Sequence, residues 1–276
     1  FSSGGIASLT LDSSDVGKYS LTLLDDSGSY SSGVTVSGNT AVMTISPFAL
    51  GVDVYETTAG ANPGGTATSG IGFVSAATPF SADIKGLLWQ IADDSDNNGI
   101  PDAGATLSDN ALAPAFAWPA VLSEQAAYTP ASPSAASLSG SLNIASSGYS
   151  GGKATVTDQK YAEVGSFTLD ATITDYLNSA GISFSTQQVV GRFYPDYLTL
   201  GAVAITAACG TFSYMDQDSV SLSAVAQAFN ADDVTVSLYD NDTLGYANTA
   251  LLTLSAENND DGVDLSARIS TPPALV

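Results

Sequence analysis

The stretch that decides the fold is residues 161–169, Tyr-Ala-Glu-Val-Gly-Ser-Phe-Thr-Leu, because its pattern has a second copy near the start of the chain. Residues 15–21, Asp-Val-Gly-Lys-Tyr-Ser-Leu, repeat it as an acid, Val, Gly, any residue, an aromatic residue, a hydroxyl residue and Leu. In each copy the glycine, Gly17 or Gly165, forms a turn that leads into a strand whose alternate side chains face one core. This internal repeat predicts two related β-domains, in which both glycines are structural.

The rest of the chain favours strands over helices. Short alternating runs are separated by Gly, Asn, Asp and Pro, and no run has the length and 3.6-residue period of a substantial helix. We therefore expect an all-β chain of two tandem Ig-like β-sandwich domains, residues 1–145 and 146–276, divided near the Pro- and Ser-rich segment 128–134. The expected strands include residues 19–24, 41–45, 52–55, 80–91, 153–156, 167–173, 184–190, 197–206 and 220–226.

Charge and composition exclude several classes of function. The 276 residues carry 6 Lys and Arg against 28 Asp and Glu, a net charge of -22, so the chain repels nucleic acids and anionic lipid headgroups. The longest apolar run, residues 197–209, is shorter than the roughly 20 residues that cross a bilayer. We expect a soluble, processed or excised piece with no membrane insertion. Its surface, rich in Ser, Thr, Gly and Ala, is typical of secreted bacterial adhesive and filament proteins.

A series of ordered motifs resembles one known family. Residues 190–196, Val-Gly-Arg-Phe-Tyr-Pro-Asp, follow the Glu-Val-Gly strand, and earlier come Pro47-Phe48, a strand ending in Trp89 and an Asp-rich loop. In this order the chain resembles the C-terminal region of MshQ-like proteins, which belong to the mannose-sensitive haemagglutinin (MSHA) type IV pilus system. The resemblance covers most of residues 6–225. It implies a non-enzymatic, cell-surface or pilus-associated bacterial protein and supplies no catalytic residues.

The densest polar segment is residues 93–102, in which oxygen-bearing side chains and a glycine have the spacing of a calcium loop. We expect calcium to be the cofactor. The position of a bidentate Glu in an EF-hand is held by Ala105, which favours an extracellular calcium loop of another kind. The alternative is a solvated acidic turn. The expected ligands are the side chains of Asp94, Asp96, Asn98 and Asp102 and the carbonyl of Ile100.

Other polar clusters and the cysteine receive structural interpretations. The acidic groups at 232–233 with 240–242, and at 258–264, lack full loop spacing and are expected to be hairpin turns. Cys209 is the sole cysteine, which rules out an intrachain disulfide. We expect it to be a small buried hydrophobic residue; the alternative is pairing with a segment outside this chain.

Arg192 and the two tryptophans each have a structural and a functional interpretation. Arg192, near Asp196, is expected to act as a structural pin between strand and loop by pairing with a carboxylate, with Asp196 as part of the same structural unit. Trp89 and Trp118 could stack on sugars, but large aromatic residues in sandwiches are more often part of the core.

Catalysis has little support in the sequence. The chain contains no histidine, so triads and dyads that use an imidazole base are excluded. We expect a non-enzymatic, calcium-stabilised adhesin or structural protein of the bacterial surface. Its expected partners are a pilus or neighbouring surface protein, a second copy of the chain through self-association or strand donation, or a glycan. The alternative is a secreted module that binds or hydrolyses glycans through Trp89, Trp118 and a carboxylate pair.

Overall fold

The computed structural model of the chain is all-β, which confirms the expected fold class. It describes residues 4–27, 29, 33–131, 138–214, 217, 221–240, 243–248, 250–251, 262–264 and 274–275. Over this part of the chain the helical elements are two short 3₁₀ turns, η1 (Leu107–Asp109) and η2 (Ser146–Gly148), and no helix is long and apolar enough to cross a membrane.

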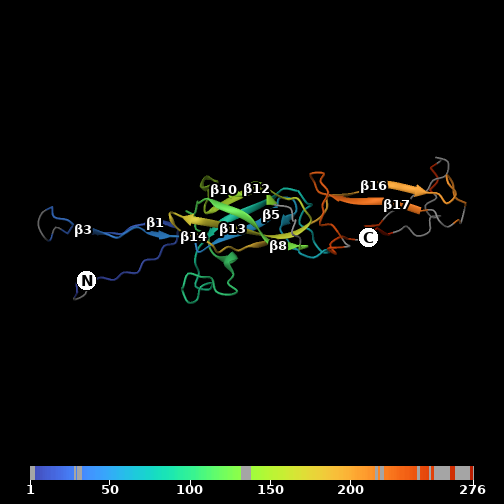
Figure 1. Ribbon diagram of the computed structural model, residues 1–276. Coiled ribbons are helices and arrows are strands. Elements are labelled where there is room, and N and C mark those ends of the chain that lie inside the picture. The colour runs from blue at the N-terminus through green and yellow to red at the C-terminus, as the bar shows by residue number, and fades with distance from the viewer. Residues whose placement is uncertain are drawn as a thin grey trace.

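Two sheets face each other in the centre of the molecule (Figure 1). The first sheet has the order β11-β12-β7-β5-β6 with β9 also paired to β12, and the second has the order β10-β8-β13-β14 with β15 also paired to β13. The first sheet consists of β5 (Ala49–Glu56), β6 (Gly60–Ala61), β7 (Phe80–Leu87), β9 (Leu138–Ser139), β11 (Tyr149–Ser150) and β12 (Lys153–Tyr161). The second consists of β8 (Ala120–Thr129), β10 (Asn143–Ile144), β13 (Gly165–Tyr176), β14 (Ser179–Ile182) and β15 (Gln188–Phe193).

The core between the sheets is apolar and rich in aromatic rings. Inward-facing residues of both sheets form one cluster, because alternate side chains of each strand point to the same face. Phe193 is at its centre, with ring centroids 5.8 Å from Phe73, 5.7 Å from Phe80, 5.2 Å from Tyr161 and 6.1 Å from Phe167. These contacts bring together strands from the beginning and the end of the central unit.

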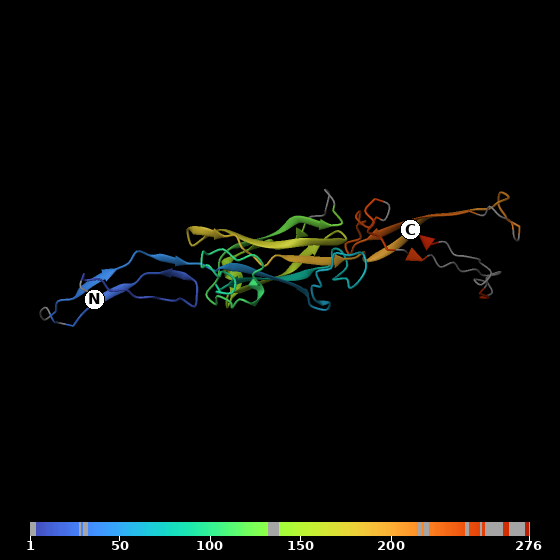
Figure 2. The same cartoon turned by 90° about the horizontal axis from the view of Figure 1, so that it is seen from below.

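A two-stranded ribbon projects from each end of this sandwich, and the two figures show the ribbons on opposite sides of the molecule (Figures 1 and 2). In the N-terminal ribbon β1 pairs with β4 and β2 with β3, and in the C-terminal ribbon β16 pairs with β17. The N-terminal ribbon comprises β1 (Gly17–Tyr19), β2 (Thr22–Asp25), β3 (Val36–Asn39) and β4 (Met43–Ile45); the C-terminal ribbon comprises β16 (Tyr197–Thr206) and β17 (Ser221–Phe229). A short pair, β18 (Ala250–Leu251) and β19 (Ala274–Leu275), follows.

The sheets do not follow the expected division into residues 1–145 and 146–276. Strand β7 pairs with β12, and β8 pairs with β13, so each sheet takes strands from both sides of that boundary. The physical reason is that β7 and β12 each have a strand close in sequence, β5 and β11, on one edge, so their other edges are open and pair with each other. The same holds for β8 and β13, which have β10 and β14 beside them and pair with each other. The tandem Ig-like arrangement is therefore not what organises the central sandwich.

The repeated acid-Val-Gly motif nevertheless has one local structure in both places. Asp15 Oδ1 accepts a hydrogen bond from the Val16 amide at 2.8 Å, and Glu163 Oε1 accepts one from the Val164 amide at 3.1 Å. Both valines are buried, and both glycines have a positive φ, 146° at Gly17 and 104° at Gly165.

The two copies differ in the strand that follows. After Gly165, Phe167 and Leu169 are fully buried in the core, whereas after Gly17 the corresponding Tyr19 and Leu21 lie exposed on the N-terminal ribbon.

The acidic side chain of each copy, Asp15 or Glu163, also accepts hydrogen bonds from a segment that is distant in sequence. The Asp15 carboxylate accepts the Ala115 amide at 3.0 and 3.1 Å from its two oxygens. The buried Glu163 carboxylate accepts the Ser237 amide at 2.8 Å, the Ser237 hydroxyl at 2.9 Å and the Leu238 amide at 3.1 Å. Glu163 thereby fixes a second, small core at the base of the C-terminal ribbon, which includes Val164, Ala228, Val236, Leu238 and Tyr246.

Candidate functional sites: the acidic loop, the Trp89 pocket and the clamp on strand β5

The acidic loop follows β7 and is closed around the buried side chain of Asp94. Asp94 Oδ2 accepts the Trp89 indole N–H and the Gly99 amide, each at 2.9 Å, and Asp94 Oδ1 accepts the Asn98 amide at 2.9 Å. Asn97 and Gly99 have left-handed φ values of 55° and 82°, which the short Asx turns of the loop require. The loop is thus wrapped tightly around one carboxylate.

The other expected ligands also accept hydrogen bonds from within the loop. Asp102 Oδ2 accepts the Ser95 amide at 2.9 Å and its hydroxyl at 2.7 Å, and Asn98 Oδ1 accepts the Ile100 amide at 2.8 Å. Asn98 Nδ2 donates to Asp96 Oδ2 at 2.9 Å. Among the described residues no three His, Cys, Asp or Glu side chains converge as a metal-binding group. Calcium would have to replace several of these hydrogen bonds with coordination bonds.

Both central carboxylates of the loop are held in their charged form. Burial is the largest influence on Asp94 and raises its pKa, but hydrogen bonds from Trp89, Gly99 and Asn98 outweigh it and leave the pKa below its ordinary value. The two hydrogen bonds from Ser95 likewise lower the pKa of Asp102. The stability that each contributes is present above the ordinary carboxyl pKa and is lost as the pH falls through the lowered value.

A neighbouring acid, Asp93, is less well satisfied. Its side chain is buried; Oδ1 accepts the Thr106 amide at 3.1 Å, whereas Oδ2 has no hydrogen-bond partner. A buried carboxylate oxygen without a partner is costly, and a cation or water is a suitable partner for it.

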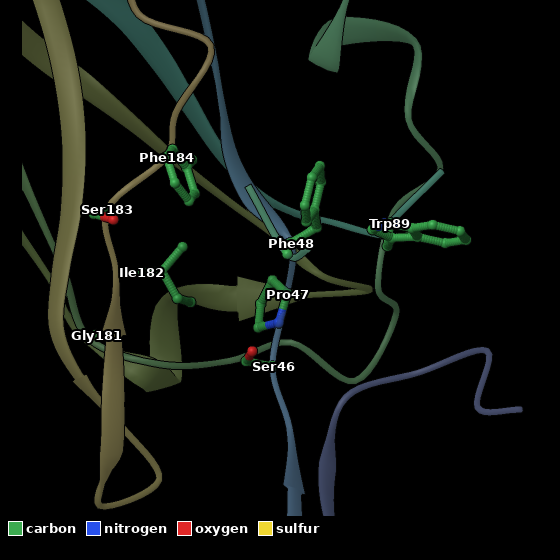
Figure 3. Close-up of a pocket in the computed structure, with 9 residues that line it drawn as sticks. Ser46, Pro47, Phe48, Trp89, Gly181, Ile182, Ser183 and Phe184 are labelled. Atoms are coloured by element: carbon green, nitrogen blue, oxygen red, sulfur yellow. The ribbon is translucent and has the colours of Figure 1, made fainter. Parts of the chain in front are cut away.

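An open pocket of about 260 Å³ lies beside the acidic loop (Figure 3). The segment before β5 contributes Pro47 and Phe48, the end of β14 and the residues after it contribute Ile182 and Phe184, and Trp89 comes from the segment after β7. The remaining lining residues are Ser46, Gly99, Gly181 and Ser183.

Trp89 is 42% exposed, so the expectation that it belongs to the core is wrong. Because Asp94 holds the indole N–H, the ring has a fixed orientation and leaves an aromatic face available to an apolar surface, such as one side of a sugar ring. Trp118 differs: its indole N–H donates to the Asp175 carbonyl, and its ring packs against the core at Tyr176. The pocket therefore has one tryptophan, not two.

Arg192 acts as a pin, but on a different partner from the one expected. Its guanidinium donates to the carbonyls of Thr68 at 2.7 Å and Gly70 at 2.8 Å, where the sequence suggested a carboxylate. A planar guanidinium suits two neighbouring carbonyls because its N–H groups form a fork. Asp196 is exposed and contributes through its backbone, whose amide donates to the Phe229 carbonyl at the base of the C-terminal ribbon at 2.8 Å.

The remaining expectations concern the end of the chain. Residues 230–234 form the expected turn, in which Asn230 Oδ1 accepts the amides of Asp232 and Val234 at 3.0 Å each. Asn241 and Asp242, and most of residues 258–264, lie outside the described residues. Cys209 is exposed, contrary to expectation, because it lies in the turn that follows β16 and not in a sheet that faces a core.

A further polar contact, which was not predicted from the sequence, joins residues 184–188 to β5; we call it the β5 clamp and define it as these residues against β5. The Leu50 amide donates to the Phe184 carbonyl at 2.8 Å and the Thr186 amide donates to the Leu50 carbonyl at 2.9 Å. Leu50 and Ser185 form a parallel bridge.

Side chains continue the β5 clamp beyond the backbone ladder. The Val52 amide donates to Thr186 Oγ1 at 2.8 Å, and the Val54 amide donates to Gln188 Oε1 at 3.1 Å. These side-chain bonds keep Thr186 and Gln188 attached to β5, while the backbone of the same segment continues as β15 and pairs with β13. The run Ser-Thr-Gln-Gln at 185–188 was the available signal, because hydroxyl and amide groups can replace backbone partners.

The fold and these sites define an all-β chain in which two sheets are joined by the clamp and carry a ribbon at each end. Residues 163–275, from Glu163 to β19, match the family model described as DUF6701, third domain. This match covers the second part of the sandwich and the C-terminal ribbon. No curated protein and no solved structure matches the chain.

Proposed function

We propose that this chain is a non-enzymatic structural module of a bacterial surface protein that carries tension along its long axis. The observation that supports this proposal is the direction of its terminal strands. The N-terminal ribbon leads into the start of β5, and the C-terminal ribbon continues from the end of β15, at the opposite end of the sandwich (Figure 2). Tension between the ribbons therefore enters the sandwich through β5 and leaves it through β15.

The β5 clamp lies on this path in the orientation that resists tension best. Residues 184–188 run parallel to β5, so opposite pulls on the start of β5 and the end of β15 slide the two segments along each other. The hydrogen bonds of the clamp then bear the load together, whereas bonds in a hairpin opened from one end break one after another. This arrangement is what a load-bearing element of a surface appendage requires.

Substitution of Thr186 tests the proposal. Thr186→Val removes the hydroxyl that accepts from Val52 and donates to its carbonyl at 3.2 Å, and leaves the shape of the side chain nearly unchanged. We expect a clear fall in the force that unfolds single molecules pulled from residues 46 and 196. Thr172→Val, in the middle of β13, is the matched control and should leave this force unchanged. Equal unfolding forces for Thr186→Val and the unsubstituted chain would contradict the proposal.

Calcium binding at the acidic loop is part of this proposal. It is supported by the donor types of Asp94, Asp96, Asn98 and Asp102, by the ionised state of the central carboxylates and by the unpartnered buried oxygen of Asp93. An ion there would stiffen the loop that anchors Trp89 at the end of β7.

We expect millimolar calcium to raise the Tm, because extracellular loops bind it at roughly 10⁻⁴ to 10⁻³ M. Asp96→Asn should abolish the rise with little effect on the metal-free protein, because its amide oxygen can still accept from Asn98 Nδ2, as Asp96 does at 2.9 Å, and only the longer bond from the Asn98 backbone amide, at 3.3 Å, is lost. Magnesium is the control cation. An unchanged Tm in calcium would show that hydrogen bonds alone close the loop.

A glycan-binding role for the Trp89 pocket is a second candidate function. It is favoured by the exposed, oriented indole of Trp89 at a pocket that Ser46 and Ser183 also line. A change in Trp89 fluorescence on titration with oligosaccharides, in a Trp118→Phe background, would distinguish it from a purely mechanical role. The type IV pilus system and the bacterial cell surface are the setting that the sequence resemblance suggests for either role.

A further inference from the structure

The two ribbons and the N-terminal segment present apolar side chains to solvent. Leu198, Leu200, Val203 and Ile205 of β16 are all exposed, Ile205 to 72%. Two-stranded ribbons are marginally stable in water, and their open edges and uncovered faces are sites where another strand adds. In the described part of the chain β16 and β17 form a two-stranded sheet, and the further pairing that β17 makes is at its base, where Phe229 forms an antiparallel bridge with Thr235. Among the described residues, the C-terminal ribbon is therefore a two-stranded sheet with open edges along most of its length.

A segment suited to completing this sheet lies at the other end of the molecule. Residues 6–11, Ile-Ala-Ser-Leu-Thr-Leu, belong to no strand in the described structure, and Ile6, Leu9 and Leu11 are 66%, 66% and 58% exposed. In an extended conformation Ala7, Leu9 and Leu11 point to one face, and Ile6 with the hydroxyls of Ser8 and Thr10 to the other. This alternation matches a strand that covers an apolar face.

The distribution of charge also favours contact between residues 6–11 and the C-terminal ribbon. The chain carries a net charge of -22, so two copies repel each other over most of their surface. Residues 6–11, 197–214 and 221–229 contain no Asp, Glu, Lys or Arg. Contact between residues 6–11 and the C-terminal ribbon therefore brings no charges together.

The segment cannot reach the C-terminal ribbon of its own chain. Asp15 and Val16 are fixed to the sandwich by the bonds to Ala115 and by burial of Val16. Leu11 lies five residues before Val16, so it reaches at most about 18 Å from it at full extension. The 12 residues of β13 run from one end of the sandwich to the other and span roughly 40 Å, which is more than this reach. A second copy is the occupant that this geometry permits.

We propose that residues 6–11 of one copy add as a strand to the edge of the β16–β17 ribbon of the next copy. The interface joins two different surfaces at opposite ends of the molecule, so it repeats head to tail and builds a linear chain of modules. The inference rests on the proposed function, because modules linked in this way are placed in series under tension. The C-terminal ribbon of each copy then gains a third strand.

Disulfide trapping tests the proposal. In a Cys209→Ala background, Ser8→Cys is placed in one protein and Ser223→Cys or Thr199→Cys, on β17 or β16, in another. Mixing and mild oxidation should give a cross-linked dimer with at least one of the two ribbon variants. A chain that carries both cysteines should give a ladder of multimers. A double variant that cross-links only within single copies, or no mixed dimer with either edge, would overturn the proposal.

Sedimentation provides the second readout. The weight-average mass of the unsubstituted chain should rise with concentration, reaching about three times the monomer mass when half of the copies' contacts are formed, as expected for a linear head-to-tail chain. Leu9→Asp with Leu11→Asp should remain monomeric. Ile71→Asp with Ile91→Asp adds the same charge at equally exposed apolar positions of the sandwich and should associate like the unsubstituted chain. A monomer at every concentration would overturn strand addition but leave the single-molecule unfolding force, and hence the proposed function, unaffected.

Discussion

Gly165→Ala should destabilise the chain far more than Gly17→Ala, although the two glycines occupy the same place in a repeated motif. A Cβ at residue 165 would lie 2.0 Å from the Thr129 carbonyl oxygen and 2.9 Å from Pro130 Cδ. A Cβ at residue 17 would meet nothing closer than the Tyr19 ring at 3.5 Å. Both variants bear the strain of a positive φ, about 1–3 kcal/mol, but only Gly165→Ala adds the backbone overlap, about 1–3 kcal/mol more.

Urea unfolding of both variants measures this difference. We expect Gly165→Ala to have a much lower midpoint or to fail to fold, and Gly17→Ala to show the smaller fall in midpoint that the positive φ alone produces. Equal midpoints would mean that β8 and β13 do not approach each other at Thr129 as described.

Loss of the Glu163 carboxylate should have the second largest effect. Glu163→Gln keeps the shape of the side chain but replaces one acceptor oxygen with an NH₂ group, which faces either the Ser237 amide and hydroxyl, now bound to Oε2, or the Leu238 amide, now bound to Oε1. Removing a charged acceptor from buried donors costs about 1–3 kcal/mol for each group left without a partner, so a loss of roughly 2–4 kcal/mol in unfolding free energy is expected.

Glu56→Gln is the matched control for this substitution. Glu56 also accepts two backbone amides, from Thr58 and Ala59, but in an exposed turn where water can replace the lost acceptor. Its midpoint in urea should hardly change. If Glu163→Gln were as mild as Glu56→Gln, the base of the C-terminal ribbon would not depend on this carboxylate.

The local parts of the structure could be predicted from the sequence, because they depend on neighbouring residues. The acid-Val-Gly motif contains its own cap and its own turn glycine, and the spacing of residues 93–102 is enough to indicate a wrapped Asx loop. The spacing does not determine whether the Asp94 oxygens face an ion or the N–H groups of Trp89, Asn98 and Gly99, since both need the same turn.

The pairing of distant strands could not be predicted. Alternation marks residues 80–87 and 153–161 as strands, but not that β7 and β12 share a sheet, because many registers bury the same number of apolar side chains. The expected boundary near residue 145 failed to describe the sheets for this reason. Trp89 and Arg192 were interpreted from their neighbours in sequence, whereas their partners, Asp94 and the carbonyls of Thr68 and Gly70, depend on how the loops lie.

The dependence of unfolding force on the direction of pull tests the central claim most directly. With Cys209→Ala as background, one chain is pulled through cysteines at residues 46 and 196, which shears the β5 clamp. A second chain is pulled through cysteines at residues 46 and 92, which opens β5 from β7 at their adjacent ends, where the Phe48 amide donates to the Leu87 carbonyl at 2.8 Å. We predict a several-fold higher unfolding force for the first pair at the same loading rate. Equal forces for the two pairs, or a lower force for the first, would contradict a load-bearing role for this fold.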